Sequence, residues 1–318
     1  MRRYAILFAL VSLFLPITVF AQTPEAAINH FKNAIKKCGA GDLDGAIEDY
    51  TRAITLSANF GARKKGATAV GNSFTGSADA ATEEITIVDP FTANAYNNRG
   101  FLRYQKGDYT GAIDDFNRAV RIKPSLALAY VNRSAALTAT GDVGGAMKDL
   151  DKAIALDKDL FQAFNNRGIL NLDARKHEAA LADLNRAIEL NDKVADTFYY
   201  RGTTQLGLKN FDAAIADYDR ALKLEPNSAW AYQGRGTALM AKGEMLRAME
   251  DFNRAIERNP KIAWAYLNRG LIWVFMGDES KAQSDFAECL NLKPELKADL
   301  ERRATLARAL HRIGQPPE

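Results

Sequence analysis

Histidine, cysteine and closely spaced carboxylates are the side chains from which proteins build nucleophiles, general bases and metal sites. This sequence of 318 residues contains three histidines and two cysteines. His30, His177 and His311 lie far apart in the sequence and have no recurring companion. Two cysteines are too few for a disulfide framework or a zinc site. We therefore expect a protein that is not an enzyme, with no cofactor and no metal.

Arginine and aspartate follow a different pattern, because they recur at one spacing along most of the chain. The sequence contains six contiguous repeats of 34 residues, and we number the positions within each repeat from 1. Position 23 is always Asp and position 7 is always Arg. The recurrence indicates structural ion pairs rather than catalytic groups, since catalysis needs one site and not a series. The repeats are 93–126, 127–160, 161–194, 195–228, 229–262 and 263–296.

The ends of the series suggest how the charges pair. An additional repeat begins at Ala27 and contains Asp49, but it has Asn33 at position 7. After the last repeat the count continues to Arg303 at position 7. Pairing each Asp with the Arg of the following repeat leaves neither end unpaired, so we predict inter-repeat pairs. The predicted pairs are Asp49–Arg99, Asp115–Arg133, Asp149–Arg167, Asp183–Arg201, Asp217–Arg235, Asp251–Arg269 and Asp285–Arg303.

Each repeat predicts two helices that position these charges. Apolar residues are spaced by three and four over positions 1–14 and 17–30, which is typical of amphipathic helices. Position 4 is aromatic, position 24 is large and apolar, and positions 8, 20 and 27 are small. Pairs such as Gly107-Asp108 separate the two helices. One hairpin cannot bury its apolar faces, whereas stacked hairpins can. Cys289 occupies the small position 27, so we expect it to be buried.

This pattern resembles the tetratricopeptide repeat family. The resemblance covers most of the chain after residue 21, and it implies an all-α protein: a right-handed α-solenoid of about seven helical hairpins with a C-terminal capping helix. The family usually has Leu at position 7 and an aromatic residue at position 11, whereas this chain has Arg and a mixture of residues. These departures concern helix packing and leave the expected fold unchanged.

The resemblance also implies a binding surface. In the family, the first helices of the repeats line a concave groove that holds partner peptides. Amide side chains can donate and accept hydrogen bonds along an extended backbone, and tyrosine and tryptophan provide rigid apolar area. An alternative is that the amides merely cap neighbouring carbonyl groups. The candidate residues are Asn94, Asn97, Asn98, Asn132, Asn165, Asn166, Tyr199, Tyr200, Trp230, Gln233, Trp264 and Asn268.

Three segments lie outside the contiguous repeats. The first repeat, residues 22–56, predicts helices over Pro24–Gly39 and Leu43–Leu56. Residues 57–88 are rich in glycine, alanine, serine and threonine, which predicts a surface loop or a partner-contacting arm, with a short strand over Ile85–Val88 as one option. Residues 89–92 lead into the six repeats. Residues 297–318 predict a final helix, Lys297–Ile313, whose arginines solvate the end of the stack.

The first 21 residues have the layout of a secretory signal peptide. Arg2 and Arg3 are followed by an apolar run from Ala5 to Leu15, and Val19-Phe20-Ala21 offers small residues where signal peptidase reads. An uncleaved anchor is the alternative, although the apolar run is shorter than the roughly 20 residues of a membrane span. We expect export, to the periplasm if the source is a Gram-negative bacterium, and no membrane span in the mature chain.

Charge and repeats together restrict the function. The 42 basic and 39 acidic residues nearly balance, so no strong positive field favours nucleic acid. We expect a non-enzymatic scaffold of the cell envelope that binds a protein or peptide of unknown identity in its groove. The alternative is an accessory subunit of an envelope enzyme or of a glycan-export or assembly complex. A disulfide between chains through Cys38 and the oligomeric state remain open questions.

Overall fold

The structure of the protein is a computed structural model that describes residues 23–68 and 90–313. In these two ranges all regular structure is helical, with fifteen α-helices and one short 3₁₀ helix. The helices are α2 (Glu25–Gly39), α3 (Leu43–Thr68), α4 (Pro90–Gln105), α5 (Tyr109–Ile122), α6 (Ala127–Thr140), α7 (Val143–Leu156), α8 (Phe161–Asp173), α9 (His177–Leu190), α10 (Ala195–Gly207), α11 (Phe211–Leu224), α12 (Ala229–Ala241), α13 (Met245–Arg258), α14 (Ala263–Phe275), α15 (Glu279–Leu292), η2 (Pro294–Leu296) and α16 (Lys297–Ile313).

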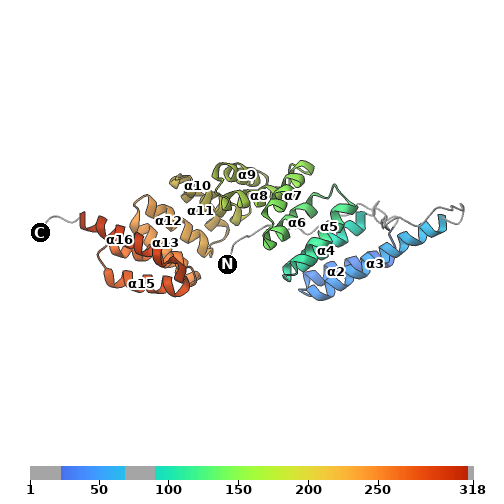
Figure 1. The fold of residues 1–318 in the computed structure, drawn as a ribbon, viewed down its shortest axis with the longest axis horizontal. Coiled ribbons are helices and arrows are strands. Elements are labelled where there is room, and N and C mark those ends of the chain that lie inside the picture. Colours follow the sequence, from blue (N-terminus) through green and yellow to red (C-terminus); the bar gives the residue numbers. More distant parts are fainter. Residues whose placement is uncertain (1–22, 69–89, 314–318) are drawn as a thin grey trace. The chain divides into compact units, whose positions relative to one another are not determined.

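The helices form consecutive hairpins, and the chain divides into two compact parts, with the boundary in the sequence between Leu170 and Asn171. In the N-terminal part, α2 packs on α3, α4 on α5 and α6 on α7. In the C-terminal part the hairpins are α10–α11, α12–α13 and α14–α15. A second helix also packs on the first helix of the next repeat, as α3 does on α4 and α11 on α12. Figure 1 shows these consecutive hairpins, and the predicted all-α solenoid fold is confirmed.

The residues in the turn between the two helices of a hairpin explain where the first helix ends and the second begins. Gly107 follows α4 with φ of 82°, a left-handed conformation that suits glycine. Asp108 then caps α5 because its Oδ1 accepts a hydrogen bond from the backbone N–H of Gly111 at 2.9 Å. The same pair of features recurs at the start of α7, where Asp142 accepts from the backbone N–H of Gly145. The predicted Gly-Asp turns are therefore present.

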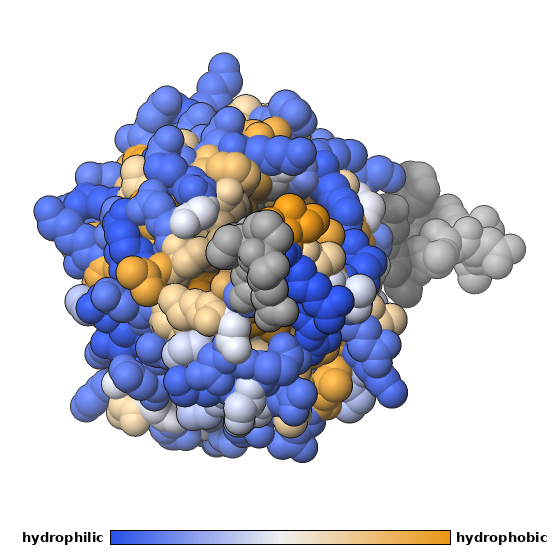
Figure 2. All heavy atoms as spheres, turned by 90° about the vertical axis from the view of Figure 1, so that its left-hand side faces the viewer, coloured by the Kyte–Doolittle hydropathy of each residue, from blue (hydrophilic) through white to orange (hydrophobic). Residues whose placement is uncertain are grey.

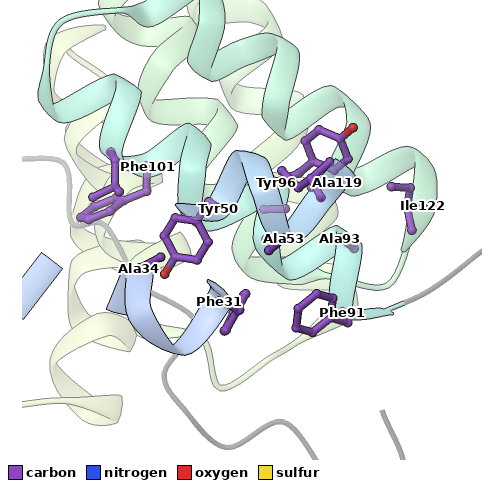
Figure 3. Packing of buried hydrophobic residues seen from close by; sticks show 14 of the residues in the cluster. Phe31, Ala34, Tyr50, Ala53, Phe91, Ala93, Tyr96, Phe101, Ala119 and Ile122 are labelled. Carbon is purple, nitrogen blue, oxygen red and sulfur yellow. The ribbon is translucent and has the colours of Figure 1, made fainter. Parts of the chain in front are cut away.

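The apolar core runs through the interior of each hairpin and into the next one. At the beginning of the N-terminal part, Phe31 of α2 meets Tyr50 of α3 with ring centroids 5.2 Å apart. Phe91 of α4 lies on the other side of Phe31 at 5.0 Å. Figure 3 shows these rings among the small side chains Ala53 and Ala93, which let the helices approach closely. The apolar core of one hairpin is therefore covered by side chains of the next hairpin.

The structure corrects the predicted end of the second helix in the first repeat. We expected this helix to stop at Leu56, but α3 continues to Thr68. Residues 57–68 contain alanine, arginine and lysine, which are strong helix formers. Ser57 also accepts a hydrogen bond from the hydroxyl of Thr92 at 2.8 Å, which ties α3 to α4. The predicted strand at Ile85–Val88 lies outside the described residues.

Within the described ranges, no helix combines the length and the apolar composition that crossing a membrane requires. The predicted signal segment, residues 1–21, also lies outside the described residues.

Candidate binding surface

All twelve predicted binding residues lie on the first helices of the repeats. The amide-rich group belongs to the N-terminal part, and the aromatic group belongs to the C-terminal part. The amides are Asn94, Asn97 and Asn98 on α4, Asn132 on α6, and Asn165 and Asn166 on α8. The second group is Tyr199 and Tyr200 on α10, Trp230 and Gln233 on α12, and Trp264 and Asn268 on α14.

The amides of the N-terminal part bond to one another and to a buried tyrosine. Asn98 Nδ2 donates to the Tyr50 hydroxyl at 3.3 Å, and Asn97 Nδ2 donates to Asn98 Oδ1 at 3.2 Å. Asn132 Nδ2, one repeat further on, donates to Asn97 Oδ1 at 3.0 Å. None of these three amides is more than 1% exposed. The expectation that they stand exposed in a groove is therefore wrong, because the side chain at position 24 reaches the amide at position 6 of the next repeat.

Three other amides in this part are also buried. Asn165 and Asn166 are 0% exposed, and Asn165 Nδ2 donates to Asn166 Oδ1 at 3.3 Å. Asn94 is 1% exposed, yet neither its Oδ1 nor its Nδ2 has a hydrogen-bond partner among the described residues. A buried amide without partners costs about 1–3 kcal/mol of stability. Peptide binding by these residues stays a prediction.

The aromatic residues of the C-terminal part are more accessible. Tyr199, Trp230, Gln233 and Trp264 are half-buried, whereas Tyr200 and Asn268 are buried, against expectation. Asn268 and the residues around it form a polar cluster in this part, described next.

The polar cluster joins two neighbouring first helices through Thr237 of α12. Its hydroxyl oxygen accepts a hydrogen bond from Gln233 Nε2 at 2.9 Å and one from Asn268 Nδ2 at 3.2 Å. Asn268 Oδ1 is buried and has no donor among the described residues. Thr237 was not among the predicted residues, because position 9 is threonine in only two of the six contiguous repeats and apolar in the other four. The cluster therefore leaves one acceptor oxygen unsatisfied near the half-buried tryptophans of α12 and α14.

One gap in the amide series has a steric cause. Position 6 is Gly234 in repeat 229–262, where most repeats have Asn. A Cβ atom at Gly234 would lie 2.5 Å from the ring of Tyr218, which occupies position 24 of the preceding repeat. The Tyr218 hydroxyl also lies within hydrogen-bond distance of Thr203 Oγ1, at 3.1 Å, so the ring is held in place. Glycine at position 6 therefore makes room for the larger ring.

The ion pairs form within repeats, and the predicted inter-repeat pairing is wrong. Arg133 Nε donates to Asp149 Oδ2 at 2.7 Å, and Arg133 Nη2 donates to Asp149 Oδ1 at 2.6 Å. Position 7 of one helix faces position 23 of its antiparallel neighbour, because positions at equal distances from the connecting turn lie side by side. The hydrogen bond to Asp149 raises the pKa of Arg133. The same bidentate geometry occurs in Arg99–Asp115, Arg201–Asp217, Arg235–Asp251 and Arg269–Asp285.

The same arginines also connect repeats, but through position 25. Arg133 Nη1 donates to Asn117 Oδ1 of the preceding repeat at 2.8 Å. Polar residues therefore recur at position 25 for a structural reason that the sequence analysis missed. The inter-repeat bonds are Arg99–Thr51, Arg133–Asn117, Arg167–Asp151, Arg201–Asn185, Arg235–Asp219 and Arg269–Asn253.

The two ends of the series use other partners. His30 Nδ1 lies within hydrogen-bond distance of Asp49 Oδ1, at 2.7 Å. Lys37 Nζ forms an ion pair with Asp49 Oδ2, also at 2.7 Å. Burial acts to raise the pKa of Asp49, but the bonds from Lys37 and His30 outweigh it and lower the pKa. Arg303 forms an ion pair with Asp299 on its own helix at 2.7 Å. Asp49 and Arg303 are therefore paired without inter-repeat bridges, which is why the ends of the series did not reveal the true pairing.

The histidines and cysteines are distributed over four helices, α2, α9, α15 and α16. His177 and His311 are on α9 and α16, and His311 Nδ1 lies 3.0 Å from the carbonyl oxygen of Phe275. Among the described residues, no three histidine, cysteine or acidic side chains lie close enough together to hold a metal ion. Cys289 is buried as predicted, and burial raises its pKa to about 11. Cys38 is half-buried, and both cysteines are free thiols.

Comparison with known proteins agrees with this architecture. Models of the tetratricopeptide repeat match residues 93–126, 195–228, 231–262 and 265–296, so the chain contains tetratricopeptide repeats. Such repeats mediate protein–protein interactions. No curated protein matches the sequence.

Solved structures of repeat proteins are similar to this chain in fold. A tetratricopeptide repeat protein from Parabacteroides merdae has 18% identity and a TM-score of 0.58, over 89% of this chain and 100% of that one. PilF of Pseudomonas aeruginosa has 21% identity and a TM-score of 0.58, over 65% and 97%. YrrB, described as a tetratricopeptide repeat protein with an unusual peptide-binding site, has 23% identity and a TM-score of 0.50, over 61% and 97%. At these identities the similarity concerns the fold alone.

Proposed function

We propose that this protein is a non-enzymatic scaffold that binds a peptide or protein segment on the first helices of its C-terminal part. The observation that carries the proposal is that two tryptophans on neighbouring first helices stay partly exposed beside the polar cluster. Trp230 and Trp264, on the same two first helices as the polar cluster, are half-buried. The presence of tetratricopeptide repeats supports the general role.

The chemistry of this surface favours an extended segment with an apolar side chain. Gln233 is half-buried, and an amide side chain can hydrogen-bond the backbone of the segment. Trp230 and Trp264 offer rigid rings that gain free energy when they are covered, and tryptophan is common at binding hot spots. Recognition of the backbone together with an apolar residue requires no exact sequence, so we propose that several related segments bind.

Selection of peptides tests the proposal. A display library of random peptides is selected against the purified chain, and the affinity of each selected peptide is measured by calorimetry. Replacing Trp230 or Trp264 with alanine should weaken binding at least tenfold, because each truncation removes a ring at a predicted hot spot.

Leu246→Ala is the matched control, since Leu246 is 71% exposed but lies on the second helix α13. It should leave the affinity unchanged. Unchanged affinity in both tryptophan variants would exclude this surface as the binding site. Circular dichroism of each variant verifies that the helices remain.

We further propose that the scaffold acts in the cell envelope after export. The support is the layout of residues 1–21, with two arginines, an apolar run and a small-residue cleavage site. Intact mass and N-terminal sequencing of the protein from fractionated cells test the proposal. A mature chain beginning at Gln22 in the exported fraction is expected, and a full-length chain in the cytoplasm contradicts export.

A further inference from the structure

Arg303 on α16 differs from the other arginines at position 7 in its partners. Arg269, in the preceding repeat, uses Nε and Nη2 to bind Asp285 and Nη1 to bind Asn253. Arg303 Nε lies 2.7 Å from Asp299 Oδ2 but outside hydrogen-bond geometry. Its two terminal nitrogens have no hydrogen-bond acceptor among the described residues. The donors of Arg303 are therefore largely unused.

The residues around Arg303 explain why its donors lack acceptors. Position 25 of the preceding repeat is Ala287, which has no side-chain oxygen, whereas the other repeats have a polar residue there. Asp299 also forms an ion pair with Arg302 at 2.5 Å, so two guanidinium groups share one carboxylate. Glu301 is two positions before Arg303 and therefore on the opposite side of α16. One positive charge at this place is left without a counter-charge.

Arg303 lies at the edge of the proposed binding surface. Its guanidinium carbon is 5.5 Å from the ring centroid of Trp264. Contact with an aromatic ring uses the flat face of a guanidinium, whereas its N–H donors point outward in the plane. The side chain of Arg303 is 39% exposed, so these donors are accessible to a ligand. A group that binds them lies next to the exposed part of Trp264.

The two first helices that carry the tryptophans have no uncompensated charge. Arg235 is the only charged residue of α12 and Arg269 the only one of α14, and both are paired with aspartates. A segment on these helices therefore meets unpaired charge only where it reaches α16. Figure 2 shows this end of the chain, where apolar residues in tan and orange are bordered by hydrophilic residues in blue. The surface suits a segment that has an apolar side chain and a negative charge close together.

We propose that Arg303 binds a carboxylate of the partner segment, next to the apolar side chain that covers Trp264. This inference rests on the proposed binding surface and adds a charge requirement to it. A guanidinium donates two parallel hydrogen bonds to a carboxylate, which fixes the position and direction of the segment. The carboxylate belongs either to an aspartate or glutamate side chain or to the C-terminus of the segment, and the experiment distinguishes these two sources.

Parallel peptide selections test the proposal. Random peptides are displayed once with a free C-terminus and once as an internal loop, and both libraries are selected against the purified chain and against Arg303→Ala. Aspartate or glutamate close to an apolar residue should be enriched among loop binders of the original chain. Enrichment confined to the free-ended library identifies the C-terminal carboxylate instead. In either case Arg303→Ala should lose the preference.

Arg312→Ala is the matched control for charge. Arg312 is exposed on α16 and lies nine positions after Arg303, on the opposite side of the helix. Its replacement removes the same charge from the chain and should leave the preference for a carboxylate unchanged. Loss of the preference in this control would overturn the specific contact in favour of a general attraction to a basic helix.

Calorimetry with the tightest binding peptide measures the contact. Replacing its carboxylate with the amide should weaken binding to the original chain about tenfold, because a charge-assisted hydrogen bond is lost. The same replacement should hardly change binding to Arg303→Ala. Arg303→Lys keeps the charge but lacks the planar fork, so it should retain only part of the preference. Circular dichroism and the melting temperature verify that each variant is folded.

The results separate this inference from the proposed function. Equal affinity for the acid and amide peptides, with binding still lost in Trp264→Ala, would overturn the carboxylate contact and leave the binding surface in place. Binding that depends on neither Trp230 nor Trp264 would exclude the surface and the contact together.

Discussion

At the scale of single residues, the arginine at position 7 links three helices. Arg133 bonds to Asp149 in its own hairpin and to Asn117 in the preceding one. It also lies over the ring of Tyr130 at 5.4 Å, which adds a cation–π contact. The side chains of Arg133 and Asp149 are only 19% and 9% exposed. Removal of one partner therefore leaves a largely buried charge, which costs more than the intact pair contributes.

A double-mutant cycle tests the assignment of the ion pairs. Arg133→Ala should lower the free energy of unfolding by about 3 kcal/mol, because Asp149 is left unpaired. Urea titration of Arg133→Ala, Asp149→Ala and the double variant should give a large coupling energy. The cycle between Asp115 and Arg133 should give almost none. The exposed pair Arg52–Glu48 is the control and should contribute less than about 0.5 kcal/mol.

The two thiols should differ in reactivity. The thiolate is the reactive form, and a pKa of about 11 keeps Cys289 protonated at pH 8. Burial also raises the pKa of Cys38, but this thiol is half-buried and therefore more accessible. A disulfide reagent at pH 8 should modify Cys38 slowly and Cys289 only after unfolding. Cys38→Ser should abolish the reaction of the folded protein, and rapid modification of that variant contradicts the burial of Cys289.

At the scale of helices, small residues set the distance between the two halves of a hairpin. Position 8 is glycine in most repeats, and the ring at position 24 lies directly against it. A Cβ atom at Gly270 would lie 2.5 Å from the ring of Phe286 and 3.3 Å from Cβ of Asp285. The glycine therefore brings the helix carrying Arg269 close enough for the bidentate pair with Asp285.

Two glycine-to-alanine changes should have opposite effects. Gly270→Ala should lower the free energy of unfolding by about 1–3 kcal/mol, because overpacking outweighs the better helix propensity of alanine. Gly144→Ala in α7 should raise it by about 0.5–1 kcal/mol, since its Cβ would meet only Asp142 Oδ1 at 3.8 Å. Urea unfolding measures both. If Gly270→Ala stabilised the protein, the close contact expected between the added methyl group and Phe286 would be contradicted.

At the scale of the whole molecule, contacts are local along the chain. Each hairpin packs mainly on its sequence neighbours, and the chain divides into two compact parts. In such arrays stability is approximately a sum of repeat and nearest-neighbour contributions. A local defect should therefore weaken nearby hairpins more than distant ones, and unfolding need not be two-state.

Hydrogen exchange measured by mass spectrometry tests this locality. In Gly270→Ala, amide exchange should accelerate most in α14, α15 and α16, because these helices share one core. It should accelerate less in α10 and α11, and it should not change in α2 to α5. Uniform acceleration across all helices would instead indicate one cooperative unit.

Much of the helical architecture could be predicted from the sequence. α7 spans the predicted positions 143–156 and α16 the predicted 297–313, because periodicity and turn residues act locally. The burial of Cys289 followed from its place in the repeat. All twelve candidate binding residues lie on first helices, but the sequence could not show which of them other side chains cover.

The sequence by itself determined the repeat, the helices and the residues that every hairpin shares, since these depend on spacing within about thirty residues. Only the tertiary structure decided that Arg133 pairs with Asp149 and that Tyr50 bonds to Asn98. The physical reason is geometric. The repeating pattern is the same whether each Asp pairs with the Arg of its own repeat or with the Arg of the following repeat. Only the way the two antiparallel helices of a hairpin face each other selects the partner.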